Sequence, residues 1–117
     1  MMDLEEIYGA IQAFATERDW DQYHNPKNLV MALSVEAAEL VEEFQWLTPE
    51  QAENLDEDPE RLARVRDEIA DVAVYLIRLS GKLGIDMEGA IEQKMRKNAE
   101  KYPAEKVRGS AKKYTEY

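Results

Sequence analysis

Long stretches of helical periodicity, interrupted by few helix-breaking residues, limit the fold of this chain more than any other feature. Its 117 residues contain only 5 glycines and 4 prolines. Between these residues, apolar side chains recur every three or four positions, as they do on one face of an α-helix. The pattern predicts four helices, at residues 3–18, 26–47, 59–83 and 87–102. We therefore expect an all-α fold, a four-helix bundle in a single domain over residues 1–117, with a basic tail from about residue 103.

Local start and stop signals support these boundaries. The dipeptides Asn25-Pro26 and Asp58-Pro59 each offer a capping side chain followed by proline at the first helical position, and Gly84 offers a helix stop. The segment from Thr48 to Gln51 has the form of a capping box and predicts a short helical turn between the second and third helices. Val74 and Ile77 lie off the main apolar stripe of the third helix, which indicates a second buried side and favours oligomerisation.

The charge distribution and the absence of cysteine exclude several classes of function. Residues 1–93 carry 22 acidic and 7 basic side chains, whereas residues 94–117 carry 3 acidic and 8 basic side chains. An acidic body repels phosphate backbones, so we expect no nucleic acid polymer as a partner. Without cysteine, any metal must take oxygen or histidine ligands. No segment approaches the ~20 apolar residues of a membrane span, and the start of the chain lacks the order of a secretory signal, so we expect a cytoplasmic protein without a membrane partner.

Two pairs of carboxylates stand out from the general acidity. Glu36 and Glu39 lie one turn apart on the second helix, and Glu68 and Asp71 lie one turn apart on the third. Glu36 and Glu68 fall at the edge of the apolar stripes, where an ionised carboxylate is costly unless it is neutralised. If the two helices pair antiparallel, all four groups reach one level of the bundle. Such a cluster favours Mg²⁺ or Mn²⁺, although the residues alone fit a charged groove without an ion equally well.

This arrangement resembles the signature of the MazG-like superfamily of all-α nucleoside triphosphate pyrophosphohydrolases. Further segments are similar to its dCTP pyrophosphatase branch, namely residues 18–24, 28–33, 44–46, 71–76, 94–95, 102–103 and 113–116. The resemblance implies a MazG-like fold and Mg²⁺-dependent hydrolysis between the α and β phosphorus atoms. The implied substrate is dCTP or a modified dCTP, which would yield dCMP and pyrophosphate in cleansing of the nucleotide pool. A homodimer or homotetramer is implied as well.

The resemblance also assigns roles to individual residues. The implied metal ligands are Glu36, Glu39, Glu68 and Asp71. Glu39 is the expected proton acceptor, with Glu36 and Glu68 as alternatives. The implied base and sugar pocket comprises Trp20, Asp21, Gln22, Tyr23, His24, Trp46 and Tyr75. We expect Lys94 and Asn98, one turn apart in the basic C-terminal segment, to contact the phosphates.

Alternatives remain open at this point. Tyr75 also fits a core position, Trp46 a hydrophobic lid, and His24 a surface or capping role. Ile11 stands where vertebrate members of the branch have a histidine near the substrate, which leaves the base preference undecided. An enzyme of the same fold that acts on dUTP or a phosphoribosyl-ATP instead of dCTP is a further alternative. A different class of function, a non-catalytic helical protein-interaction module, predicts indifference to Mg²⁺.

Overall fold

The computed structural model describes residues 1–110, and within them the chain is helical with no β-strand. Its elements are α1 (Leu4–Glu17), the 3-10 turn η1 (Asp21–Tyr23), α2 (Pro26–Phe44), α3 (Pro49–Glu53), the 3-10 turn η2 (Leu55–Glu57), α4 (Pro59–Lys82), α5 (Met87–Lys101) and α6 (Ala104–Val107). The expected all-α class is confirmed, and the four expected helices correspond to α1, α2, α4 and α5. The short helix α6 begins where a basic tail was expected, and residues 113–116 of the resemblance lie outside the described part of the chain.

The helices begin where the sequence supplies a capping side chain. Asn25 accepts a hydrogen bond from the backbone N–H of Asn28 at 2.9 Å, and Asp58 accepts one from Arg61 at 3.2 Å. At α3, Thr48 and Gln51 form the expected reciprocal capping box, with distances of 2.9 and 3.1 Å. These side chains satisfy N–H groups that have no partner within the helix, which fixes the first turn of each element.

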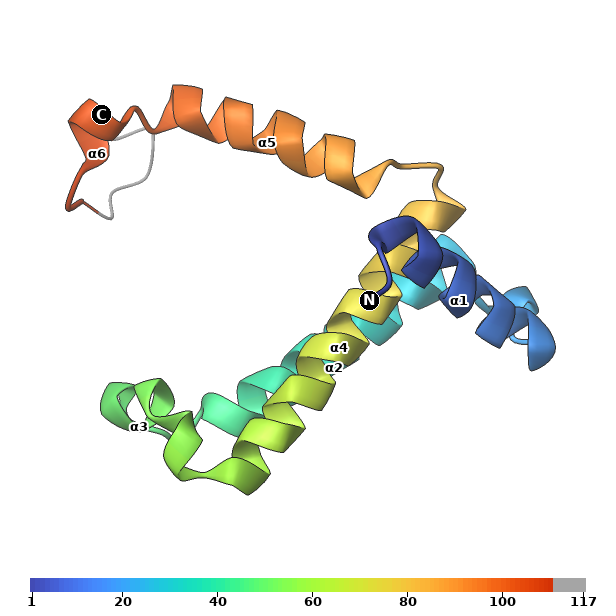
Figure 1. Cartoon of the computed structure of the whole chain (residues 1–117), viewed down its shortest axis with the longest axis horizontal. Coiled ribbons are helices and arrows are strands. Elements are labelled where there is room, and N and C mark those ends of the chain that lie inside the picture. The colour runs from blue at the N-terminus through green and yellow to red at the C-terminus, as the bar shows by residue number, and fades with distance from the viewer. Residues whose placement is uncertain (111–117) are drawn as a thin grey trace. The chain divides into compact units, whose positions relative to one another are not determined.

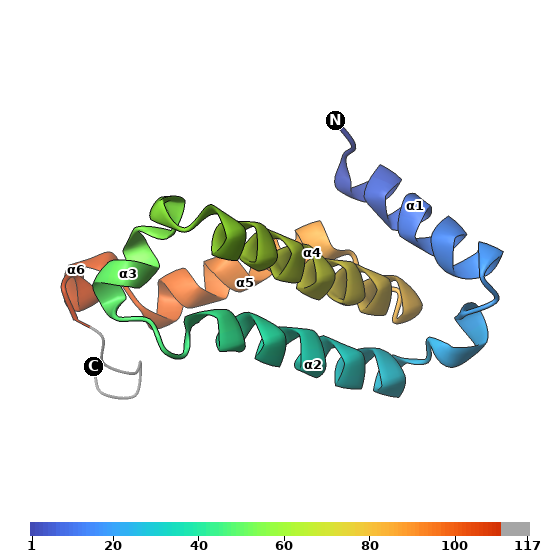
Figure 2. The same ribbon diagram turned by 90° about the horizontal axis from the view of Figure 1, so that it is seen from below.

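Within residues 1–84, α2 and α4 form an antiparallel hairpin, as Figures 1 and 2 show from two directions. Leu29 of α2 and Val65 of α4 are its buried apolar side chains. Near the connecting end, Arg61 donates to the backbone carbonyl of Glu43 at 2.6 Å, and Arg64 donates to the carboxylate of Glu43 at 2.9 Å. These contacts fix the register of the two helices and therefore the relative heights of the acidic residues farther along.

Helix α1 packs against the C-terminal half of α4, and this contact depends on a glycine. A Cβ atom built on Gly81 would lie only 1.9 Å from a ring carbon of Tyr8. The missing side chain thus lets the tyrosine ring rest directly on the helix backbone. Ala15, near the end of α1, is the buried residue of this helix.

The chain divides into two compact units, Met1–Gly84 and a second that begins at Ile85 and contains α5 and α6. Gly84 has the left-handed backbone conformation (φ 66°) that commonly ends a helix, as its position predicted. The extent of the domain over residues 1–117 stays a prediction. None of the helices within residues 1–110 combines the length and apolar character that crossing a membrane requires.

Candidate active site

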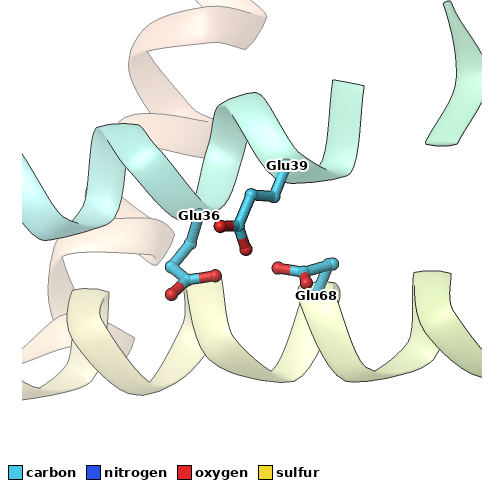
Figure 3. Close-up of side chains that lie close together, drawn as sticks. All are labelled: Glu36, Glu39 and Glu68. Atoms are coloured by element: carbon cyan, nitrogen blue, oxygen red, sulfur yellow. The ribbon is translucent and has the colours of Figure 1, made fainter. Parts of the chain in front are cut away.

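Three carboxylates meet across the hairpin. Glu36 and Glu39 extend from α2, and Glu68 extends from α4 toward them (Figure 3). One oxygen of each residue lies within 4.8 Å of those of the other two. The spacing of three residues puts both α2 acids on one side of the helix, and the antiparallel register brings Glu68 to the same level. No other set of three or more acids or histidines within residues 1–110 approaches this closely.

Interactions among the carboxyl groups shift the protonation of this cluster. Interaction with the carboxyl of Glu68, loss of hydration and the negative charge of Glu39 raise the pKa of Glu36 from 4.5 to about 7. The contact with Glu36 lowers the pKa of Glu68, but loss of hydration and the charges of Glu39 and Asp71 outweigh it, so the net direction is upward. In the absence of a cation, the three groups therefore hold negative charge at an energetic cost.

Two oxygens of the cluster have an environment that suits a cation. The Oε2 atoms of Glu36 and Glu68 are buried and have no hydrogen-bond partner. Buried acceptors without a donor are rare in folded proteins, because each loses its hydration without compensation. Hard oxygen ligands from several carboxylates are the donor set of Mg²⁺, Mn²⁺ or Ca²⁺. Glu36, Glu39 and Glu68 thus fit a divalent cation.

The fourth expected carboxylate, Asp71, does not belong to this group of three. It lies one turn farther along α4 than Glu68, and its negative charge contributes to the raised pKa of Glu36. Asp71 and Glu36 both line a pocket of about 470 Å³ in the first unit. Glu36 is therefore shared by the acidic cluster and the pocket.

The remainder of the pocket wall is mainly apolar and aromatic. Phe14 of α1, Trp20, His24, and Val74 and Tyr75 of α4 contribute to it. The rings of Phe14 and Trp20 meet edge to face at 5.8 Å, and the rings of Trp20 and His24 lie 6.4 Å apart. Val74 lies off the main apolar stripe of its helix, and for that reason the sequence analysis expected it at a contact between copies of the chain. In the structure it lines this pocket within one chain. An apolar pocket with a few polar groups at one end is the usual form of a small-molecule site.

A buried arginine completes the wall, and the sequence analysis missed it. Arg78 of α4 is only 2% exposed, and it donates hydrogen bonds to Asp21 and to Nδ1 of His24. Lys82 donates to the same Asp21 oxygen at 2.7 Å. The hydrogen bond from Lys82, with the positive charges of both cations, holds the pKa of Asp21 below its ordinary value. Burial and the charge of Arg78 lower the pKa of His24. A signal was available, because Arg78 follows Asp71 by seven and Tyr75 by three residues and so shares their helical face.

The structure brings some of the expected pocket residues together. Trp20, His24 and Tyr75 line the pocket. Asp21 contacts Arg78 and Lys82 instead, as described above. Gln22 donates to the backbone and the carboxylate of Asp19, both at 3.0 Å, and thereby closes the turn before α2.

The other expected contacts lie elsewhere. The carbonyl of Tyr23 accepts a hydrogen bond from the side chain of Asn28, while its ring is exposed. Trp46, 87% exposed just beyond the end of α2, is not among the described residues that line the pocket. Lys94 and Asn98 are on α5, in the second unit.

Known proteins resemble this chain in both sequence and structure. The model of the MazG-like family matches residues 31–117. The chain is 41% identical to human dCTP pyrophosphatase 1 over 113 residues, and 40% identical to the rat protein of the same name (Rattus norvegicus); both alignments cover 97% of this chain and 66% of the relative. It thus spans just under two thirds of the length of these relatives.

A solved structure has a similar fold. The crystal structure of a pyrophosphatase from Archaeoglobus fulgidus, at 1.80 Å resolution, is 40% identical in sequence and superposes with a TM-score of 0.79 over 88% of this chain and 94% of that chain. The family resemblance seen in the carboxylate motif is confirmed. This chain belongs to the MazG-like family.

Proposed function

We propose that this chain is a Mg²⁺-dependent nucleoside triphosphate pyrophosphohydrolase that converts dCTP, or a modified dCTP, to dCMP and pyrophosphate. The observation that carries the proposal is the position of Glu36, which belongs to both the acidic cluster and the aromatic pocket. A nucleotide needs a cation site for its phosphates and an apolar pocket for its base at adjoining positions. The names of the relatives, dCTP pyrophosphatase 1, support cytosine as the base.

The cation would be held by Glu36, Glu39 and Glu68. Asp71, which lines the adjoining pocket, remains our fourth proposed ligand. When bound, a divalent cation neutralises phosphate charge and lowers the pKa of a coordinated water. The buried, unpartnered oxygens belong to Glu36 and Glu68, which supports these two as ligands. Glu39 has no such oxygen. We propose that its carboxylate accepts the proton of the attacking water.

The pocket residues would orient the nucleoside. Stacking of a base on an aromatic ring contributes roughly 1–3 kcal/mol, and Trp20 is the indole that lines the pocket. Tyr75 follows Asp71 by one turn of α4 and lines the pocket together with His24, and its hydroxyl is our proposed contact to the sugar. Lys94 and Asn98 remain our proposed contacts to the departing phosphates, because the segment from residue 94 supplies cations that the acidic body lacks.

We further propose a homodimer or homotetramer in the cytoplasm, with no nucleic acid polymer or membrane as a partner. Large apolar side chains on both central helices support the assembly: Val35 and Val41 on α2, and Leu62 and Ile69 on α4, are each between 44% and 60% exposed. A second copy of the chain can cover such side chains, which are costly to leave in water. Light scattering after size exclusion tests this, and a monomer at micromolar concentration would contradict it.

The test of the proposed function is pyrophosphate release from a panel of triphosphates (dCTP, 5-methyl-dCTP, dUTP, dTTP, dATP, dGTP and phosphoribosyl-ATP). We expect release from dCTP with Mg²⁺ and none with EDTA. Glu68→Gln should reduce turnover by at least about 100-fold, a loss typical when a group that stabilises the transition state is removed. Glu42→Gln, which changes an exposed acid on the same hairpin, is the matched control. Equal rates for Glu68→Gln and the parent would refute the site, and a preference for dUTP or phosphoribosyl-ATP would refute the substrate.

A further inference from the structure

Arg78 is a buried cation whose hydrogen-bonding capacity is only partly used. A guanidinium carries five N–H donors and cannot lose its charge in a protein. The Nε atom donates to His24 at 3.4 Å, and Nη2 donates to Asp21. These two atoms lie along one edge of the guanidinium. Within residues 1–110, Nη1 has no protein acceptor, so the terminal edge of the guanidinium is available to another group.

This terminal edge is accessible from the pocket. Arg78 lines the pocket together with Trp20, His24 and Tyr75. Among the described residues, only two side-chain atoms are both fully buried and without a hydrogen-bond partner, and both are glutamate oxygens. Nη1 of Arg78 has no partner and is not one of these atoms, so it is not fully buried. The small exposed fraction of Arg78 can therefore include the donor that lacks an acceptor. A ligand in the pocket could accept from it without any rearrangement of the contacts to Asp21 and His24.

The distance along α4 places Arg78 at the base end of a bound nucleotide. Asp71, Tyr75 and Arg78 succeed one another on one face of the helix, and seven residues correspond to a rise of about 10 Å. Phosphates beside Glu36 and Asp71 would leave the sugar near Tyr75 and the base near Arg78. This is about the reach of a nucleoside from its 5′-phosphate.

The polar groups of Arg78 and His24 at this end of the pocket are hydrogen-bond donors. Because Nδ1 of His24 accepts from Arg78, the neutral ring carries its proton on Nε2. Burial and the charge of Arg78 lower the pKa of His24, which favours this neutral form. A guanidinium edge pairs best with two adjacent acceptors. Cytosine presents such a pair in O2 and N3, whereas uracil and thymine place an N–H donor at N3, and adenine flanks N1 with an amino group.

We infer that Arg78 is a specificity-determining residue, whose terminal guanidinium edge donates to O2 and N3 of a cytosine base. The inference rests on the proposed function. That proposal names dCTP as the substrate, and the inference adds the residue that selects its base. Arg78 also holds Asp21 and His24 against α4, so its contacts to the protein fix the orientation in which the free edge meets the base.

The first experiment compares kcat/KM for dCTP, dUTP and dGTP in the parent, Arg78→Met, Arg78→Lys and Lys82→Met. We expect Arg78→Met to lower the dCTP value by about 10- to 100-fold and the dUTP value much less, so that the preference for dCTP largely disappears. Lysine keeps the positive charge but lacks the planar pair of N–H donors, so Arg78→Lys should not restore the preference for dCTP. Lys82→Met removes the other cation that contacts Asp21 and should leave the preference unchanged.

Several results would overturn the inference. These are an unchanged ratio of dCTP to dUTP in folded Arg78→Met, full preference in Arg78→Lys, or a parental preference for dGTP, whose O6 and N7 are also adjacent acceptors. If the parent hydrolyses no triphosphate, the proposed function itself has failed.

A binding experiment separates the inference from catalysis and from the folding of variants. The guanidinium N–H signals of the ¹⁵N-arginine-labelled parent are followed in EDTA as dCMP or dUMP is added. We expect dCMP to shift and protect the Nη signals of Arg78, and dUMP to leave them nearly unchanged. Equal responses to the two nucleotides, or none to dCMP, would refute the contact.

Discussion

Replacing Glu36 by glutamine should stabilise the metal-free protein. In the cluster, carboxylate oxygens lie within 4.8 Å of one another. Two unit charges at this distance repel by roughly 1 kcal/mol at the dielectric of water and by roughly 3.5 kcal/mol at an effective value of 20. Glutamine removes one of the charges and supplies an N–H donor to the buried, unpartnered oxygen of Glu68. The substitution thus relieves two costs at once.

The pKa of Glu36 gives a second measure of the same cost. Its increase from 4.5 to about 7 corresponds to roughly 3 kcal/mol at about 1.4 kcal/mol per unit. Because the side chain is partly exposed, solvent screening reduces the expected effect to roughly 1–2 kcal/mol. For a domain of this size, we expect an increase in Tm of about 3–8 °C.

The pH dependence fixes the sign of this effect. A carboxyl whose pKa is higher in the folded than in the unfolded protein favours folding most at low pH. That contribution is lost as pH rises from about 4.5 to about 7. The gain in Tm of Glu36→Gln over the parent should therefore be full at pH 8 and nearly absent at pH 4.5.

Thermal unfolding in EDTA, followed by circular dichroism at both pH values, measures this difference. Glu42→Gln, on the same helix but outside the cluster, controls for the general effect of removing a negative charge. The reasoning is refuted if Glu36→Gln unfolds at or below the parental Tm at pH 8, or if Glu42→Gln produces the same gain.

Three further predictions concern the ion, the helix contact and the pocket. Mg²⁺ at 100 times its Kd should stabilise the parent by roughly 2.7 kcal/mol and so raise its Tm in the same thermal assay. The Tm of Glu68→Gln should not change, and an equal increase in both proteins would contradict the ligand assignment. Gly81→Ala should cost roughly 1–3 kcal/mol, because its Cβ would overlap the ring of Tyr8; urea unfolding measures this, and Tyr8→Ala in the same chain should remove most of the penalty. Trp20→Ala should raise KM for dCTP more than it lowers kcat in steady-state kinetics, and an unchanged KM would exclude stacking on this ring.

The helices could be predicted because their signals are local. Asn25, Thr48 and Asp58 each cap the helix that follows, and the capping distances depend on residues only three positions away. The acidic cluster could be predicted in part, because periodicity and register placed Glu36, Glu39 and Glu68 at one level. The exclusion of Asp71 from this group of three depends on the packing of the two helices and could not be derived from spacing.

The pocket could not be predicted from patterns within one helix. Its wall combines α1, the turn around His24 and α4, and the approach of α1 depends on the contact of Tyr8 with Gly81, which the sequence presents only as a glycine near a helix end. The spacing of Arg78 from Asp71 and Tyr75 indicates that the three residues share one face of α4. Only the fold reveals that Arg78 is buried, because its partners Asp21 and His24 are more than 50 residues away.

The most direct test of the central claim is a crystal structure with Mn²⁺ and a non-hydrolysable dCTP analogue. The account predicts an anomalous peak at coordination distance from carboxylate oxygens of Glu36, Glu39 and Glu68, with the cytosine ring in the pocket beside Trp20 and Arg78. A manganese ion bound away from these three residues, or a base bound outside the pocket, would contradict it.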